Sequence, residues 1–199
     1  MFDLITFACG HDERLDLFIS HHKNMIPGRI VTVYGGRHCL YKHDINSNGR
    51  YLGDGHLVPH IYKLTDEYTH VLYISHDALI LENDLIQKSI KYMTENKIDI
   101  LAPSLTKSEI SPYTYGGAEV LTGIICLSLF TQKAFQHIGK NLMTGRPHVS
   151  EEVEFWETPH RAGFIVKQNP FIIPDIFTCR ILDEKRREGG AIHPHKEWT

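Results

Sequence analysis

The stretch THVLYISHDALIL, from Thr69 to Leu81, decides how the chain folds. It contains an apolar run, a short polar group with one carboxylate, Asp77, and then a second apolar run. An apolar run of this length is typical of a buried strand. A carboxylate at the end of such a strand stands where α/β sheets bind ligands, and a divalent cation on a diphosphate prefers oxygen ligands. Asp77 is therefore a candidate metal ligand; the alternative is that it only caps the following turn.

Strands and helices are expected to alternate on both sides of this stretch. Apolar runs predict strands over residues 2–8, 29–34, 70–74, 98–102, 121–128, 164–167 and 171–173. Helical spacing predicts helices over residues 11–24, 55–67, 84–96, 131–138 and 150–161. Polar loops are expected over residues 37–54 and 103–118. This order predicts a single α/β domain with a layered, mostly parallel sheet and helices on both faces.

The helix expected over residues 55–67 leads into the deciding strand. Leu57, Ile61 and Leu64 are spaced to share its buried face. Pro59 is expected in its first turn, where a missing N–H does no harm.

Composition limits the class of protein. The chain has 199 residues, 42% of them hydrophobic and 23% charged, which is typical of one globular domain. The net charge of −3 gives no basic excess for a nucleic-acid partner. The longest apolar stretch, Leu121 to Phe130, is too short to span a membrane. The N-terminus has no secretory signal pattern, so a cytoplasmic, soluble protein without a membrane span is expected.

Several familiar motifs are missing. The four cysteines form no C-x-x-C pair, so a zinc ribbon or a redox motif is not expected. The chain has no G-x-G-x-x-G fingerprint, phosphate-binding P-loop or G-x-S-x-G elbow. Ser75, His76 and Asp77 are consecutive, and neighbours on a strand point to opposite faces, so they cannot act as a catalytic triad.

The deciding stretch resembles the metal-binding strand of GT-A-fold, nucleotide-sugar glycosyltransferases, in which apolar residues precede D-x-D. Here D-x-D becomes Ser75-His76-Asp77. The resemblance implies Asp77 as the direct metal ligand and leaves Ser75 to bond the ribose of the donor. The small size also resembles the compact glycosyltransferase domains of bacteria and of large algal DNA viruses.

Further segments extend this resemblance along the chain. The opening FACGHDERLD resembles the family's nucleotide-binding start, and EEVEF followed by HRAGF resembles its E-D-x-E-F…R-x-G-[FY] segment. In inverting members a carboxylate of the latter is the general base, which implies Glu151 or Glu152. The residues implied to bind the donor nucleotide are Phe7, Ala8, Gly10, Arg14, Lys63, Ser75 and His76.

The tail GGAIHPHKEW, residues 189–198, resembles the family's C-terminal stretch that returns to the site. It implies His193 as a second metal ligand, with His195 in reserve, and Lys196 on the leaving phosphate. Carboxylate, imidazole and diphosphate oxygens suit Mn²⁺ (or Mg²⁺). The alternative is a solvated, histidine-rich terminus. Tyr113 and Tyr115, in the loop over 103–118, are candidates for stacking on an acceptor sugar.

Taken with the resemblance, the sequence predicts transfer of a sugar from a nucleotide-sugar donor, a UDP-sugar first, to a hydroxyl of a glycan or other acceptor. Residues 1–102 would form the nucleotide-binding half, and residues 103–199 the acceptor-binding half and tail. Two alternatives stay open. One is a metal-dependent nucleotidyltransferase or phosphohydrolase, and the other is a non-catalytic module that binds a nucleotide or a carbohydrate.

Overall fold

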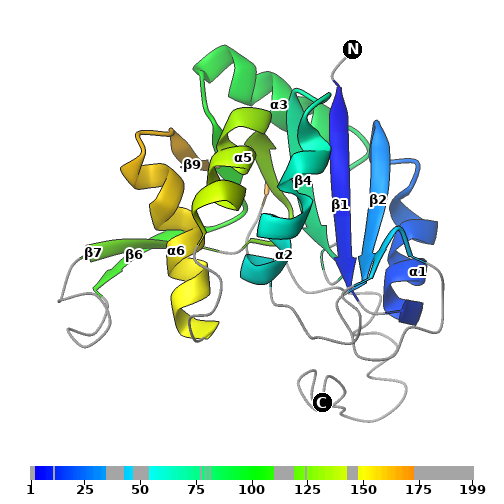
Figure 1. The fold of residues 1–199 in the computed structure, drawn as a ribbon. Helices are drawn as coiled ribbons and strands as arrows, with labels where there is room; N and C mark the ends of the chain where they lie inside the picture. The colour runs from blue at the N-terminus through cyan, green and yellow to red at the C-terminus, as the bar shows by residue number, and fades with distance from the viewer. Residues whose placement is uncertain are drawn as a thin grey trace, which may run out of the picture.

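One mixed sheet organises the chain (Figure 1). The computed structural model describes residues 3–10, 12–34, 43–46, 54–76, 78, 80, 82–109, 119–123, 125–142 and 148–172. Over these ranges the large sheet has seven strands in the order β3-β2-β1-β4-β8-β5-β9. The bounds are β1 Leu4–Gly10, β2 Arg29–Tyr34, β3 Ile45–Asn46, β4 His70–Ser75, β5 Ile100–Ala102, β8 Ser128–Thr131 and β9 Val166–Gln168.

The sheet is mostly parallel, as predicted. β1 pairs in parallel with β2 and β4, β2 with β3, and β5 with β9. β8 is the exception, because it lies between β4 and β5 and runs antiparallel to both. A strand from late in the chain therefore joins the two parts of the sheet.

Helices cover both faces, which confirms the predicted layering. Side chains from α1 (Asp12–His22) and α3 (Leu85–Asn96) pack in one buried cluster on one face. The other face carries α2 (Asp54–Ile61), the 3₁₀ helix η1 (Tyr62–Thr65), α5 (Gln132–Asn141) and α6 (His148–Arg161) (Figure 1). Among the described residues, helices thus cover each face of the central strands, and the strand ends are where such sheets bind ligands.

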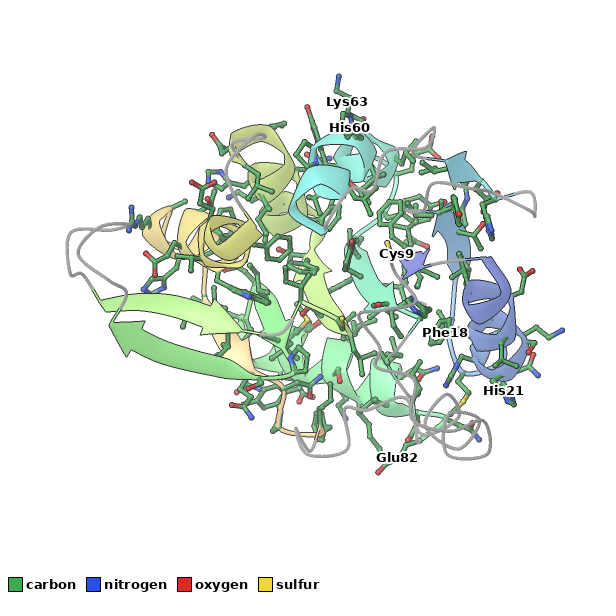
Figure 2. The ribbon with its side chains drawn as sticks, turned by 90° about the horizontal axis from the view of Figure 1, so that it is seen from below. Cys9, Phe18, His21, His60, Lys63 and Glu82 are labelled. Atoms are coloured by element: carbon green, nitrogen blue, oxygen red, sulfur yellow. The ribbon has the colours of Figure 1, made fainter. Side chains whose placement is uncertain are left out.

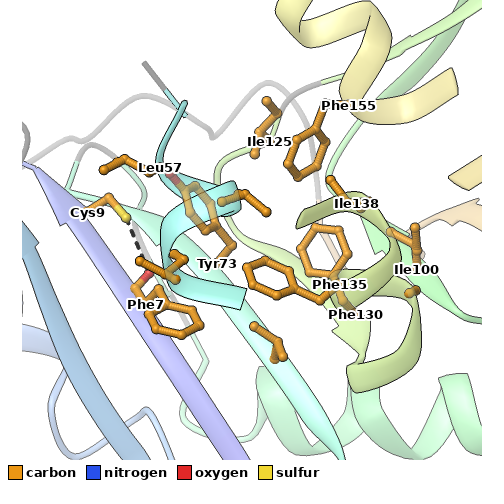
Figure 3. Close-up of a cluster of buried hydrophobic side chains, with 14 of the residues drawn as sticks. Phe7, Cys9, Leu57, Tyr73, Ile100, Ile125, Phe130, Phe135, Ile138 and Phe155 are labelled. Carbon is orange, nitrogen blue, oxygen red and sulfur yellow. Dashed lines mark hydrogen bonds between the residues drawn. The ribbon is translucent and has the colours of Figure 1, made fainter. Parts of the chain in front are cut away.

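The larger core is aromatic, and Figure 3 shows its centre. Phe7 of β1 stacks on Phe135 of α5, with ring centroids 5.7 Å apart. Phe130 of β8 meets Phe135 edge-on at 5.3 Å and Phe155 of α6 at 5.8 Å. Each fully buried phenylalanine contributes roughly 1.5–3 kcal/mol, so this cluster ties β1, β8 and two helices into one body.

The strand predicted over residues 121–128 is in fact two strands. β7 (Glu119–Gly123) pairs antiparallel with β6 (Leu105–Glu109) away from the large sheet, and β8 starts at Ser128. Between them Leu127 is left-handed, with a φ of 62°. A bulky residue in that region marks a sharp turn, which ends one strand and starts the next. β6 also occupies part of the loop predicted over 103–118, of which residues 110–118 lie outside the described ranges.

The helix predicted over residues 55–67 is shorter and irregular. α2 begins at Asp54, so Pro59 lies inside the helix and not in its first turn. A proline there removes one helical hydrogen bond, and the chain tightens into η1 soon afterwards. Leu57 and Ile61 are buried as expected, but Leu64 is 46% exposed because the change of helix type turns it outward.

Two short elements also differ from the sequence-based prediction. The loop expected over residues 37–54 includes the strand β3, two residues long. The strand expected at 171–173 is not formed at its described residues, because the N–H of Phe171 donates to the side chain of Asn169 in a turn. Residue 173 lies outside the described ranges. No helix within those ranges is long and apolar enough to cross a membrane.

Candidate functional site

The candidate site is the edge at which β1, β2 and β4 end. These strands are parallel, so their carboxyl ends meet there: Cys9 pairs with Ser75, and Gly10 with Tyr34. Figure 2 views the molecule from this edge, with Cys9 near the centre. In open α/β sheets ligands bind just beyond such strand ends.

Two backbone hydrogen bonds hold the chain as it leaves β4. The N–H of His76 donates to the carbonyl of Cys9 at 2.8 Å, and the N–H of Ala78 donates to the carbonyl of Ser75 at 3.0 Å. The first extends the β1–β4 pairing past the strand, and the second ties Ala78 back to the last residue of β4. Asp77 falls within this stretch of sequence but outside the described residues, so its role as a metal ligand stays a prediction.

Gly10 and His76 fit against each other at this edge. His76 is only 2% exposed, and a Cβ built on Gly10 would lie 2.5 Å from its Nδ1 and 2.7 Å from its Cγ. Only a glycine lets the imidazole come so close to β1. The structure therefore brings together Gly10, Ser75 and His76, three of the residues predicted to bind the donor, but packs the His76 ring inside.

The β2 side of the edge carries an aromatic pair. The rings of Tyr34 and His43 stack with centroids 5.4 Å apart and planes 4° apart. The next residue, Asp44, is tied back to β2, because its carboxylate accepts the N–H and the hydroxyl of Thr32 at 2.8 and 2.9 Å. The pair could not be predicted from the sequence, since Tyr34 lies on a strand and His43 in an expected loop, with no motif spacing between them.

A buried histidine anchors the segment that follows the β4 turn. His22, the last residue of α1, has Nδ1 2.9 Å from the carbonyl of Phe18, and its Nε2 accepts the N–H of Ile80 at 3.3 Å. A carbonyl can only accept, so Nδ1 carries the proton and the ring is neutral. Burial lowers the pKa of His22, which favours this neutral form. Neither His22 nor Ile80 was a predicted site residue.

Phe7 and Ala8 build the core behind the edge. Both are fully buried, and Phe7 stacks on Phe135. Their strand is paired with β2 on one side and with β4 on the other, so their backbone also faces protein. The structure therefore places them in the core, without a surface for a nucleotide.

Lys63 lies away from the candidate edge. It is exposed on η1, and its Nζ is 5.9 Å from the centre of the Tyr62 ring. η1 leads into the amino end of β4, where the N–H of Thr69 donates to the carbonyl of Asp3. Figure 2 shows Lys63 beside His60 at the outside of the helical layer, pointing away from Cys9.

The remaining predicted residues are only partly described. Arg14 lies in the first turn of α1, and Glu151 and Glu152 lie in the first turns of α6, with their side chains outside the described part. The other predicted residues lie wholly outside the described ranges: Asp77, Tyr113, Tyr115, His193 and Lys196. Within those ranges, no three His, Cys, Asp or Glu side chains gather as a metal site. A metal thus remains a prediction that depends on Asp77 and His193.

One buried carboxylate of α6 has a structural role. Oε1 of Glu157 accepts the N–H of Leu121 at 2.6 Å, and Oε2 accepts Nε–H of Arg161 at 2.8 Å. The first bond joins α6 to β7, so Glu157 fastens the small two-stranded sheet to the helical layer.

Comparison with known proteins places the fold. No protein-family model matches the chain, and no curated protein matches it. Among solved structures, CMP:2-keto-3-deoxy-manno-octonic acid synthetase complexed with CTP is similar over 95% of this chain and 98% of its own, at 13% identity and a TM-score of 0.53. A197 from STIV aligns over 83% of this chain and 81% of its own, at 8% identity and a TM-score of 0.48. Bifunctional IspDF from Campylobacter jejuni aligns over 83% and 48%, at 14% identity and a TM-score of 0.47.

The fold and the edge define the class of the protein. It is a mixed α/β protein with a central, mostly parallel sheet whose strand ends meet at one edge. A similar fold, over nearly the whole of both chains, is found in the synthetase complexed with CTP.

Proposed function

We propose that the protein is an enzyme that binds a nucleotide at the carboxyl edge of β1, β2 and β4 and transfers its nucleotidyl group. The observation that supports this most is the end-to-end similarity of fold to the CTP-bound synthetase. In such a reaction an acceptor oxygen attacks the α-phosphorus of a nucleoside triphosphate. The bond to the bridging oxygen breaks, and pyrophosphate leaves. The residues at this edge that would border the nucleotide are Gly10, Ser75 and the Tyr34–His43 pair.

A second candidate function is glycosyl transfer from a UDP- or GDP-sugar. It is favoured by the sequence of β4 and its turn, which resembles the metal-binding strand of the GT-A glycosyltransferases. Here the oxygen of an acceptor hydroxyl would bond to the sugar C1 and lose its proton to the general base, while the bond from C1 to the diphosphate oxygen breaks and a nucleoside diphosphate leaves. Lys196, His193, Tyr113 and Tyr115 belong to this proposal, with Glu151 or Glu152 as general base.

A bound divalent cation would neutralise diphosphate charge in either reaction. Asp77 and His193 are the residues proposed to hold it. The chain's own contribution at this edge would be to orient the nucleotide, through Ser75, through the backbone bonds of His76 and Ala78, and through the stacked pair of Tyr34 and His43.

Titration calorimetry tests nucleotide binding directly. CTP, UTP, ATP, GTP, UDP and GDP are titrated with Mg²⁺, with Mn²⁺ and with EDTA. We expect at least one to bind, and more tightly with the metal; if none binds under any of these conditions, the proposed function is wrong.

Product analysis separates the two reactions. The protein is incubated with nucleoside triphosphates and a set of sugar acids and sugar phosphates, and separately with UDP- and GDP-sugars and a set of sugar acceptors. Pyrophosphate release in the first set supports nucleotidyl transfer, and nucleoside diphosphate release in the second supports glycosyl transfer. Binding without turnover in either set would point to a non-catalytic module.

A further inference from the structure

His22 joins two parts of the chain that are 58 residues apart in sequence. It closes α1, and its Nε2 accepts the N–H of Ile80, just beyond the turn at the end of β4. The ring is 2% exposed and stacks on Phe18, with centroids 4.4 Å apart. Its position is therefore fixed from three sides: by the Phe18 ring, by the Phe18 carbonyl and by Ile80.

The segment from Ser75 to Ile80 is held at both ends. At its start, His76 and Ala78 are bonded to the ends of β1 and β4. At its far end, Ala78 and Ile80 are buried in the cluster between the sheet, α1 and α3, and Ile80 is bonded to His22. Apolar burial alone is non-directional, so the hydrogen bond to His22 sets the position of the Ile80 backbone.

We propose that His22 is a positioning residue for the candidate site: by accepting the N–H of Ile80, it holds the chain after β4 so that Ser75, His76 and Ala78 keep the positions that border the nucleotide. This inference rests on the proposed function. His22 itself lies beneath the segment and need not touch the nucleotide. One such hydrogen bond contributes roughly 0.5–1.5 kcal/mol to the stability of the folded state. If all of it is needed to hold the site in its binding form, the loss corresponds to an affinity lower by up to about tenfold.

Two isosteric variants separate the two bonds of the ring. His22→Gln can place a carbonyl oxygen where Nε2 stands, so it can still accept the N–H of Ile80. His22→Asn reaches only the Nδ1 position, so it can keep the bond to Phe18 but not the bond to Ile80. The control is His21→Asn, which changes the exposed neighbour on the same helix.

The readouts are hydrogen exchange of the Ile80 amide and the affinity for CTP with Mg²⁺. For His22→Asn we expect the Ile80 amide to exchange faster and CTP to bind up to about tenfold more weakly. For His22→Gln and His21→Asn we expect both to stay near the wild type. If His22→Asn releases the amide and leaves the CTP affinity unchanged, His22 is only structural and the proposal is overturned. An unchanged amide in His22→Asn overturns it as well.

Two further measurements keep the outcomes distinct. If the wild type binds no nucleotide, the proposed function fails and the positioning role fails with it, while Ile80 exchange still decides whether the anchor exists. If His22→Asn does not fold, the imidazole ¹⁵N chemical shifts of His22 in the wild type show which ring nitrogen carries the proton. A protonated Nδ1 and an unprotonated Nε2 support the bond to Ile80, and a protonated Nε2 overturns it.

Discussion

The imidazole of His76 lies so close to the α-carbon of Gly10 that a Cβ there would be 2.5 Å from the ring. The contact joins the last residue of β1 to the first residue beyond β4. Because the N–H of His76 is also bonded to Cys9, the ring cannot move aside without disturbing the turn. The candidate site therefore keeps its shape only if residue 10 has no side chain, because the His76 ring occupies that space.

Gly10→Ala should damage both stability and binding. We expect a loss of about 1–3 kcal/mol in the free energy of unfolding, because the new methyl group overpacks a buried ring. CTP affinity should fall as the turn shifts. Gly163→Ala is the control: it is strained by a φ of 85° but meets nothing within 4 Å and lies before β9, away from the edge. Equal CTP binding by both variants would contradict this account.

Lowering the pH should reduce the stability of the folded protein, because His22 is buried as a neutral ring. Burial lowers its pKa, so below the ordinary value of about 6.5 the unfolded chain binds the proton more readily than the folded one. The free energy of unfolding should therefore fall as the pH drops below about 6.5 and reach its full value above it. Urea unfolding across this range measures the slope.

Replacing the buried ring should flatten that slope. We expect His22→Gln to lose less stability on acidification than the wild type, and His60→Gln, an exposed position on α2, to behave like the wild type. Burial also lowers the pKa of His70, so some pH dependence should persist in His22→Gln. An unaltered slope in His22→Gln would refute the assignment.

Lys97→Gly should stabilise the protein. Lys97 ends α3 in the left-handed region, with a φ of 54°, and its N–H bonds to the carbonyls of Met93 and Thr94. Glycine adopts this conformation without strain, so we expect a gain of about 0.5–1 kcal/mol after the entropy of the unfolded chain is counted. Thermal or urea unfolding measures it. Lys97→Ala removes the same side chain and should give no gain; equal stability of the two variants would rule out the strain.

Removing the Glu157 carboxylate should loosen the small sheet. Glu157→Ala leaves the N–H of Leu121 without its acceptor, at a cost of about 1–3 kcal/mol, and the Leu121 amide should exchange faster. Glu157→Gln keeps an acceptor oxygen and loses only the partly exposed pair with Arg161, worth about 0–1 kcal/mol. If both variants lose the same stability, the ion pair with Arg161 stabilises the protein and the bond to Leu121 of β7 does not.

Asp77→Asn should remove the metal dependence of nucleotide binding. The change keeps the size of the side chain and takes away its charge, so the melting temperature should hardly change while Mg²⁺ no longer tightens CTP binding. Calorimetry with Mg²⁺ and with EDTA measures the difference. Glu82→Gln, an exposed carboxylate further along the same segment, is the control. Full metal dependence in Asp77→Asn would exclude this residue as a ligand.

The parts of the fold that follow from local patterns were predictable. β2 has the predicted bounds, Arg29–Tyr34, because a parallel strand with buried faces gives a nearly continuous apolar run, here interrupted only by Thr32 after the exposed Arg29. The split between β7 and β8 was not, since residues 121–128 read as one apolar run. What divides them is the left-handed turn at Leu127 and the pairing of β7 with β6. The pairing joins two separate segments of the chain, so the apolar pattern of residues 121–128 alone does not reveal it.

The candidate site divides in the same way. Gly10, Ser75 and His76 could be named in advance, because parallel strands end at one edge. A solvated helix face was the alternative for Lys63, and its side chain is exposed. Its place away from the edge could not be predicted, since it depends on where α2 gives way to η1. Nor could the bond from Ile80 to His22, because no spacing in the sequence marks a histidine that accepts a distant backbone N–H.

The position of β8 between β4 and β5 has a consequence for folding. β4 and β5 are successive strands of the large sheet in the sequence, yet they share no hydrogen bonds, and each pairs with β8. A nascent chain that has emerged only as far as Ala102 would leave one edge of β4 open and β5 without its neighbours. Open strand edges template aggregation. Until the residues of β8 up to Thr131 have left the ribosome, β4 therefore keeps one edge unpaired, and edge-to-edge aggregation of the nascent chain is expected in that interval.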